Sequence, residues 1–129
     1  MGEVGTAQNL NGRCLCGGSV FDGGAEARFA IQCYCRDCQH VSGGGSMPQV
    51  AIQSAALSRS GPIRTFAATS DAGNALGFSF CADCGSPLFK TTAAAPDLVF
   101  LGAGALDEPD LFTFGREVFE VGRRMWDKS

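Results

Sequence analysis

The chain has 129 residues, enough for one domain with a modest hydrophobic core and too few for several. Hydrophobic residues make up 45% of it and charged residues 18%, a balance that excludes an intrinsically disordered chain and a coiled coil. The net charge of -3 argues against a partner with a phosphate backbone, so we expect no binding to nucleic acid.

The compartment follows from what the sequence does not contain. Residues 1–12 have no apolar run, and no stretch of the chain is apolar enough to span a membrane. We therefore expect no signal peptide and no membrane partner, and we predict a cytoplasmic protein. The number of cysteines is odd, at 7, which in a reducing compartment argues against a disulfide framework. Metal binding is the remaining interpretation.

The first half of the chain predicts short strands joined by glycine turns. Residues 1–11 are expected to form a flexible segment. A strand that begins at Gly12 reaches a glycine-permitted knuckle carrying Cys14 and Cys16, and a return strand follows. Residues 27–32 alternate as a half-buried strand, which delivers Cys33 to a loop with three cysteines.

The second half continues the same pattern. Residues 42–46, Ser-Gly-Gly-Gly-Ser, are either a candidate binding loop or a plain linker turn. Strands are predicted over 47–53, 63–69, 76–80 and 87–92, and the last two form a hairpin whose tip carries Cys81 and Cys84. Residues 97–103 predict a strand buried on both faces, and 117–121 a last short strand. The sequence therefore predicts one all-β domain over residues 12–126, with a tail at 127–129.

The cysteines form three groups whose spacings are those of metal ligands. Cys-x-Cys and Cys-x-x-Cys place two sulfur atoms on one side of a tight turn, at a separation that one ion can bridge. Seven ligands divide naturally into a closed site of four, joining the two hairpin tips, and an open site of three in the middle loop. The three groups are Cys14 and Cys16; Cys33, Cys35 and Cys38; and Cys81 and Cys84.

Ordered pieces of the sequence resemble the glutathione-dependent formaldehyde-activating enzyme family, which includes the centromere protein V domain and has the Mss4-like β-fold. The resemblance runs from about Gly12 to Trp126. Its pieces are Gly12-x-Cys14-x-Cys16-Gly17 with Val20; Cys33-x-Cys35-x-x-Cys38 with Ser42-Gly43; Phe80-Cys81-x-x-Cys84-Gly85-Ser86-x-Leu88; Gly104-x-Leu106-Asp107-x-Pro109; and Trp126.

The resemblance implies two zinc ions, one structural and one catalytic with an open position. The structural ligands would be Cys14, Cys16, Cys81 and Cys84, and the catalytic ligands Cys33, Cys35 and Cys38. Two features depart from the family. Tyr34 stands where histidine is common, and the segment after Ser42-Gly43 is unusually rich in glycine. Both lie beside the expected active site, so they bear on the substrate more than on the fold.

The chemistry expected at the open site is carbon–sulfur bond formation or cleavage. Zinc held by three thiolates is a weaker Lewis acid than zinc held by three histidines and should activate water less well, so an incoming thiol is the more plausible fourth ligand. Coordination would lower the pKa of that thiol, and the thiolate could attack a carbonyl carbon or leave from a hemithioacetal. The prediction is a zinc-dependent carbon–sulfur lyase. The resemblance implies glutathione and the small aldehyde formaldehyde as substrates, combined as S-hydroxymethylglutathione.

Other interpretations stay open. Both zinc sites could be structural, in a non-catalytic module that presents a surface to a protein, and a nucleic-acid-binding zinc ribbon comes third. His40 could close the middle site, although the single residue between it and Cys38 strains a shared tetrahedron. Arg36 could attract an anionic thiol. Trp126 and the phenylalanines are expected in the core, and edge strands favour a possible homodimer.

Overall fold

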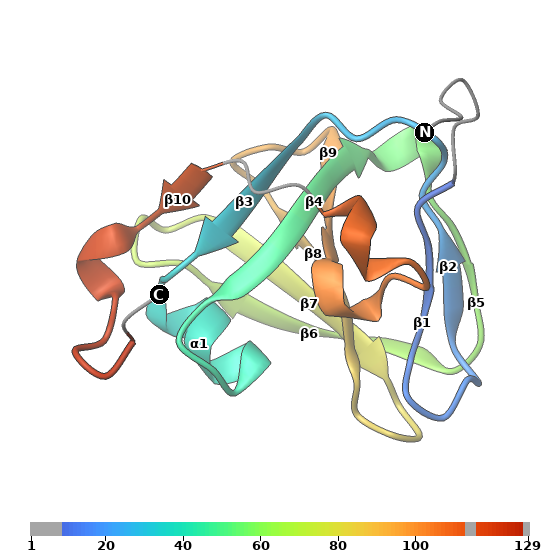
Figure 1. Ribbon diagram of the computed structural model, residues 1–129, viewed down its shortest axis with the longest axis horizontal. Helices are drawn as coiled ribbons and strands as arrows, with labels where there is room; N and C mark the ends of the chain where they lie inside the picture. The colour runs from blue at the N-terminus through green and yellow to red at the C-terminus, as the bar shows by residue number, and fades with distance from the viewer. Residues whose placement is uncertain (1–8, 113–115, 128–129) are drawn as a thin grey trace.

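The computed structural model describes residues 9–112 and 116–127, and its main element is a seven-stranded sheet (Figure 1). The strand order is β10-β3-β4-β9-β8-β7-β6. Neighbouring strands are antiparallel except β10 and β3, whose parallel pairing brings the C-terminal segment against the strand before the middle cysteines. The strands are β3 Phe29–Cys33, β4 Met47–Gln53, β6 Ile63–Thr69, β7 Ala75–Cys81, β8 Pro87–Thr92, β9 Leu98–Gly102 and β10 Arg116–Val118.

A small second sheet lies at one end of the molecule, on the right in Figure 1. Its strands are β1 Asn11–Arg13, β2 Val20–Asp22 and β5 Ser58–Ser60, in the order β1-β2-β5. Gly61 follows β5 with a φ of 106°, and a Cβ at this position would overlap the carbonyl oxygen of Gly18. This close approach holds the turn after β5 against the cysteine-bearing turn between β1 and β2.

Helical structure in the described residues is limited to short segments. None of these helices is long or apolar enough to cross a membrane. The segments are α1 Arg36–Ser42 and the single-turn 3₁₀ helices η1 Ser54–Ala56, η2 Ala103–Ala105, η3 Pro109–Leu111 and η4 Glu120–Gly122.

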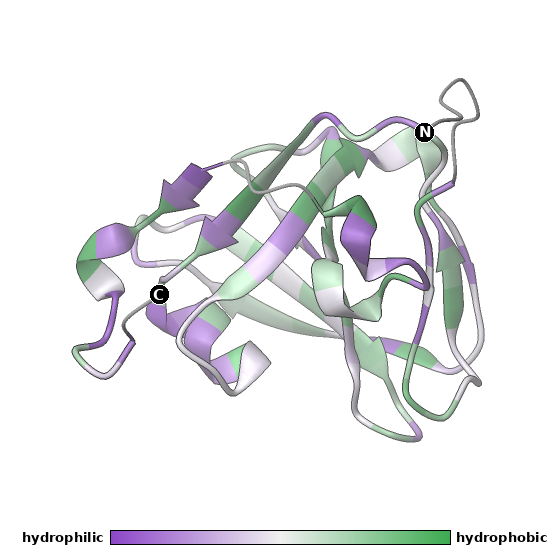
Figure 2. Ribbon diagram, in the orientation of Figure 1, coloured by the Kyte–Doolittle hydropathy of each residue, from purple (hydrophilic) through white to green (hydrophobic). Residues whose placement is uncertain are grey.

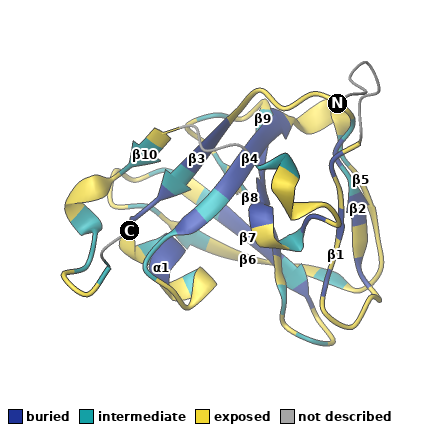
Figure 3. Ribbon diagram, in the orientation of Figure 1, coloured by how far each residue is buried: buried dark blue, intermediate teal, exposed yellow. Residues whose placement is uncertain are grey.

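Alternate residues of the central strands build hydrophobic clusters on the two faces of the large sheet, because side chains along a strand point to opposite sides. Val50 and Leu101 belong to a cluster that also contains Phe21 of the small sheet. Their neighbours Ala51 and Phe100 belong to a second cluster, in which the middle cysteines also pack. Figures 2 and 3 show β4 and β9 as largely hydrophobic and buried. Each large apolar side chain buried in this way contributes about 1.5–3 kcal/mol.

The predicted all-β class is confirmed, and several strands have the predicted bounds. Strands β4, β6 and β8 begin and end where the sequence pattern placed them. Strand β9 is buried along most of its length, as the apolar run at 97–103 indicates. Local alternation and turn residues were sufficient to predict these strand bounds, because the strands are long enough to show the two-residue period of a β-strand.

Three expectations were wrong. The middle cysteine segment continues into helix α1 instead of a loop, and the last strand ends at Val118. Trp126 is 67% exposed, and Phe66 and Phe119 are 64% and 66% exposed, so these aromatic side chains are not in the core. A seven-residue helix is too short to show helical periodicity, and in so small a protein not every aromatic side chain finds a buried position.

Candidate metal centres

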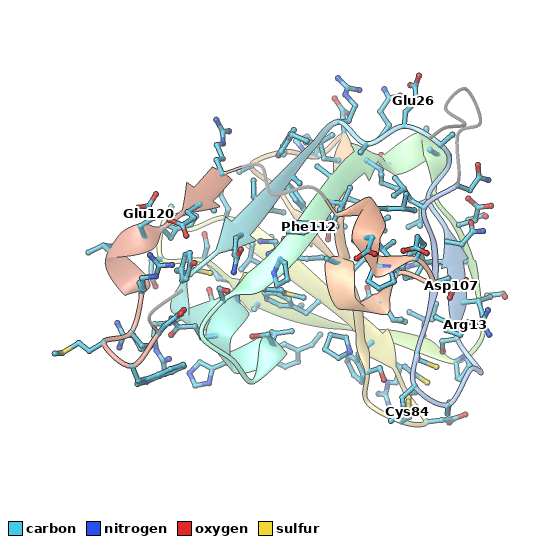
Figure 4. All side chains as sticks on the ribbon, viewed as in Figure 1. Arg13, Glu26, Cys84, Asp107, Phe112 and Glu120 are labelled. Atoms are coloured by element: carbon cyan, nitrogen blue, oxygen red, sulfur yellow. The ribbon has the colours of Figure 1, made fainter. Side chains whose placement is uncertain are left out.

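The tips of two hairpins bring four cysteines together at one end of the molecule. Cys14 and Cys16 lie in the turn between β1 and β2, Cys81 is the last residue of β7, and Cys84 lies in the turn between β7 and β8. Their sulfur atoms all lie within 4.8 Å of one another. Figure 4 shows this cluster of sulfur atoms beside Cys84.

Both hairpin tips are knuckles built in the same way. Gly17 and Gly85 follow the second cysteine of each pair with φ of 81° and 80°, a left-handed conformation that glycine adopts without strain. Their amides donate to the carbonyl oxygens of Cys14 and Cys81, at 3.1 and 2.8 Å. Ser86 connects the two knuckles, because its hydroxyl accepts a hydrogen bond from the amide of Leu15 at 3.0 Å.

The geometry of this cluster fits a tetrahedral zinc ion. Sulfur atoms bound at about 2.3 Å to one zinc lie about 3.8 Å from one another. The Sγ atoms of Cys14 and Cys16 are 3.5 Å apart, and those of Cys16 and Cys81 are 3.9 Å apart. All seven cysteines are free thiols. A hydrogen bond to Ser86 lowers the pKa of Cys84 to about 5. Against a backbone hydrogen bond from Gly18, the thiols of Cys14 and Cys84 raise the pKa of Cys16 to about 12, so a cation would be needed for all four to be thiolates.

The second cluster is assembled by the end of a strand and the start of a helix. Cys33 is the last residue of β3, Cys35 is the N-cap of α1, and Cys38 lies in the first turn of that helix. The Sγ of Cys35 accepts a hydrogen bond from the amide of Cys38 at 3.3 Å. The three sulfur atoms lie within 4.8 Å of one another. The spacing of these cysteines is therefore realised by a strand–cap–helix junction.

Two side chains donate toward the sulfur of Cys38. Gln49, fully buried on β4, donates from Nε2 at 3.4 Å, and Lys90 on β8 from Nζ at 3.8 Å. The Lys90 ammonium also lies 5.3 Å from the centre of the Phe100 ring. Donors of this kind stabilise negative charge on sulfur. These two contacts favour negative charge on the Cys38 sulfur, whereas the neighbouring cysteines disfavour it.

The thiols of this cluster strongly influence one another. Hydrogen bonds from Cys33 first, then from Cys38, lower the pKa of Cys35 to about 2. Contacts with Cys33 first, then Cys35, raise the pKa of Cys38 above its ordinary range. Three sulfur atoms this close do not all carry negative charge unless a cation balances them. A divalent ion would provide that balance, and three cysteine ligands fit zinc.

A cavity of about 360 Å³ lies against the three-cysteine cluster, and Cys33 and Cys35 form part of its lining. Three basic side chains, Arg36, Lys90 and Arg116, also line it. The cluster supplies three sulfur ligands, one short of a tetrahedron, on the side of a cavity of this size. This arrangement leaves room for a fourth ligand to approach.

The structure places His40 outside the group of sulfur atoms. His40 is exposed on α1, with Nε2 at 3.3 Å from a guanidinium nitrogen of Arg36. Arg36 also donates to the side chain of Gln39 at 2.6 Å. Among the residues that the structure describes, no histidine or carboxylate joins the three sulfur atoms as a fourth ligand.

The glycine-rich segment 42–46 does not line this cavity. Gly43 ends α1 with a φ of 73°, and the hydroxyl of Ser42 donates to the carbonyl of Ser46 at 3.0 Å. Ser42 lines a different cavity of about 410 Å³, together with Cys14. The segment's position therefore favours the linker turn over the binding loop for the middle site.

Sequence reasoning missed a set of hydrogen bonds that joins the C-terminal segment to the middle cysteines. We call this contact of Tyr34 with Glu117 and Arg123 the clasp. Tyr34, which is 1% exposed, donates its hydroxyl to Glu117 at 2.8 Å and accepts from Arg123 at 2.9 Å. The guanidinium of Arg123 also lies 4.8 Å from the Tyr34 ring centre and bonds to Glu117 at 3.1 Å.

Gln39 strengthens the clasp, because its side-chain amide lies 3.0 Å from the carbonyl of Gly45 and 2.9 Å from that of Gly122. The only signal in the sequence was the tyrosine at position 34. Its partners are 83 and 89 residues away, beyond the reach of any local pattern.

The fold and both clusters can be compared with known proteins. The family model described as glutathione-dependent formaldehyde-activating enzyme matches residues 9–121, a range that leaves out Trp126. A crystal structure of a Rhodobacter sphaeroides protein superposes with a TM-score of 0.62 and 15% sequence identity, over 84% of this chain and 100% of that one. At this identity the likeness shows the fold alone. A search of curated proteins found no match.

Proposed function

The chain belongs to the glutathione-dependent formaldehyde-activating enzyme family, and we propose that it is a zinc-dependent carbon–sulfur lyase acting on a small thiol adduct. The reaction site in this proposal is the cluster of Cys33, Cys35 and Cys38. The substrates are a thiol such as glutathione and a small aldehyde such as formaldehyde, combined as S-hydroxymethylglutathione. The proposed compartment is the cytoplasm, where thiols are kept reduced.

One observation carries this proposal: the three-cysteine cluster borders a cavity, whereas the four-cysteine cluster already offers a complete tetrahedral set. Structural zinc sites are closed by four protein ligands, and reactive sites keep a position for substrate. Cys14, Cys16, Cys81 and Cys84 would hold the structural ion. Joining hairpin tips more than sixty residues apart in sequence, it would stabilise a glycine-rich domain by limiting the unfolded chain.

The proposed reaction is the addition of a thiol to an aldehyde and its reversal. In the forward direction a sulfur–carbon bond forms, the carbonyl π bond breaks, and the thiol proton is transferred to the carbonyl oxygen. Zinc bound by the three cysteines would lower the pKa of an incoming thiol, which makes the sulfur nucleophilic at neutral pH. The residues of the chain position the reactants: Lys90 and Gln49 hold the sulfur of Cys38, and the cavity excludes bulk water from part of the substrate.

Three basic side chains, against the two carboxylates of Asp37 and Asp71, line the cavity, and this excess of positive charge supports an anionic thiol. Glutathione carries two carboxylates, and Arg36, Lys90 and Arg116 reach the cavity from three separate elements. Their side chains can orient such a substrate through charge-assisted hydrogen bonds. Arg36 has a second role as well, since it also contacts Gln39 and His40 on its own helix.

A non-catalytic zinc module is the alternative, and metal analysis separates the two. The purified full chain is measured by mass spectrometry before and after mild chelation. Two zinc ions per chain, one of them removable without unfolding, support the proposal. A single tightly held ion would contradict it, because the middle cysteines would then lack the metal that the reaction needs.

Substitution at the middle cluster then tests the mechanism. In Cys35→Ser we expect zinc content to fall from two ions per chain to one, an unchanged circular dichroism spectrum, and loss of S-hydroxymethylglutathione turnover. His40→Gln is the matched control on the same helix, and it should keep both ions because His40 lies outside the sulfur cluster. Unchanged turnover in Cys35→Ser would remove this cluster from the mechanism.

A further inference from the structure

Phe119 has an unusual backbone and an exposed side chain at the edge of the reactive cavity. Its φ is 57°, and in the described residues it alone has a positive φ without being glycine. Its ring is 66% exposed and lines the cavity beside the three cysteines. A bulky residue is disfavoured in this conformation, and such strain persists only where the surrounding structure enforces it.

Contacts of the residues on either side of Phe119 enforce its left-handed backbone conformation. The carbonyl of Val118 accepts a hydrogen bond from the amide of Tyr34 at 3.1 Å, which completes the parallel pairing of β10 with β3. Gly122 packs so closely on Tyr34 that a Cβ would overlap the Tyr34 carbonyl oxygen. The chain between these two contacts turns within three residues, and the turn presents the Phe119 ring to the cavity. Figure 4 shows η4, which carries Glu120, projecting beyond β3 and β10.

Further aromatic side chains extend this surface. Phe29 of β3 is 41% exposed and packs edge-to-face on Phe100 of β9, with ring centres 6.1 Å apart. Both rings line the same cavity, together with Ile31 and Val118. These apolar side chains come from β3, β9, β10 and the turn after β10. The hydroxymethyl group derived from formaldehyde has one carbon and a hydroxyl, so this group by itself covers little of such a surface.

We propose that this cavity accepts a thiol adduct whose sulfur-bound carbon carries an aromatic or similarly large apolar group, with Phe119 as the specificity-determining residue. The substrate class is then the hemithioacetal of an aromatic or bulky aldehyde. This inference rests on the proposed function, because it assigns the aldehyde side of the same reaction. A cavity of about 360 Å³ is within the range that encloses ligands larger than a one-carbon unit.

Two stable thioethers test the inference by binding alone. S-benzylglutathione and S-methylglutathione differ only in the group on sulfur, and neither has the hydroxyl that the cleavage reaction requires. Isothermal titration calorimetry on the full chain should show the benzyl compound binding about tenfold more tightly, the expected effect of partly burying a phenyl ring. In Phe119→Asn this ratio should fall toward one. Asparagine tolerates the left-handed conformation, so the variant should melt no lower than the original protein.

The matched control is Phe66→Thr. Phe66 is 64% exposed, almost the same as Phe119, but lies on β6 and does not line this cavity. Its substitution should leave the affinity ratio unchanged. Equal affinities for the two thioethers, binding of neither, or an unchanged ratio in Phe119→Asn would each overturn the inference.

Turnover of the formaldehyde adduct separates the two proposals. If the chain turns over the formaldehyde adduct but binds the two thioethers with equal affinity, only the proposed apolar specificity is ruled out. Benzyl selectivity without turnover of any adduct removes the lyase function and keeps the apolar site.

Discussion

The hydroxyl group of Tyr34 is expected to stabilise both the fold and the middle cysteine cluster. Tyr34 lies between two of the proposed zinc ligands, and its hydroxyl bonds to Glu117 at 2.8 Å and to Arg123 at 2.9 Å. Tyr34→Phe removes both bonds and leaves the ion pair between Glu117 and Arg123 at 3.1 Å in place. Hydrogen bonds to charged groups contribute about 1.5–3 kcal/mol each, and the surviving ion pair reduces the combined loss to about 2 kcal/mol.

Chemical denaturation of the metal-loaded chain measures this loss. We expect the free energy of unfolding to fall by about 2 kcal/mol, with a melting temperature roughly 6–10 °C lower. A double-mutant cycle with Glu117→Gln should give a coupling energy of about 1 kcal/mol or more. Thr65→Val is the control, since it removes the 2.7 Å contact of Thr65 with Ser79 away from the clasp. A loss below about 0.5 kcal/mol in Tyr34→Phe would refute the reasoning.

The pH dependence of the same variant gives a second readout. Burial first, then the hydrogen bond to Glu117, raises the pKa of Tyr34 above its ordinary value. The neutral phenol is therefore favoured in the folded state, and its contribution is complete below about pH 10, where the unfolded tyrosine ionises. Stability should fall as the pH rises above this value. Tyr34→Phe should lose less stability over that range, and identical alkaline profiles would contradict the assignment.

Three further predictions concern the turns and the two clusters. Gly61→Ala should destabilise the fold by about 3 kcal/mol or more, because the new Cβ would overlap the Gly18 carbonyl. In Gly17→Ala the new Cβ meets no atom, so this variant should lose only about 1 kcal/mol, from its left-handed backbone. Denaturant titration compares the two variants, and equal losses of stability would contradict the overlap. Cys84→Ser should lower zinc content and unfold the domain at lower temperature, unlike substitution at the middle cluster, as metal analysis with thermal melts can check. Lys90→Met should raise KM for a glutathione adduct about tenfold and also lower kcat, because Lys90 both lines the cavity and donates to the sulfur of Cys38. Lys90→Arg should restore part of both, and an unchanged KM would exclude Lys90 from substrate binding.

The cysteines show how far spacing can predict a site. Cys14 with Cys16, and Cys81 with Cys84, are close because each pair shares one local knuckle ended by a glycine. The meeting of the two knuckles depends on strand pairing between segments more than sixty residues apart, which the structure provides. The predicted groups of four and three are brought together as expected. That both groups bind zinc stays a prediction, as do the proposed domain boundaries and the homodimer.

The sequence by itself determined the β class, the bounds of β4, β6 and β8, and the two cysteine knuckles, because strand alternation and glycine turns are properties of a few neighbouring residues. Only the tertiary structure decided that Cys38 lies on a helix, that Tyr34 is held by the C-terminal segment, and that aromatic side chains border the reactive cavity. These features depend on contacts between residues far apart in the chain, and such contacts leave no periodic pattern in the sequence. The cavity that suggests a substrate is accordingly a product of the fold, formed where β3, β8, β9 and β10 place their side chains against the cysteine cluster.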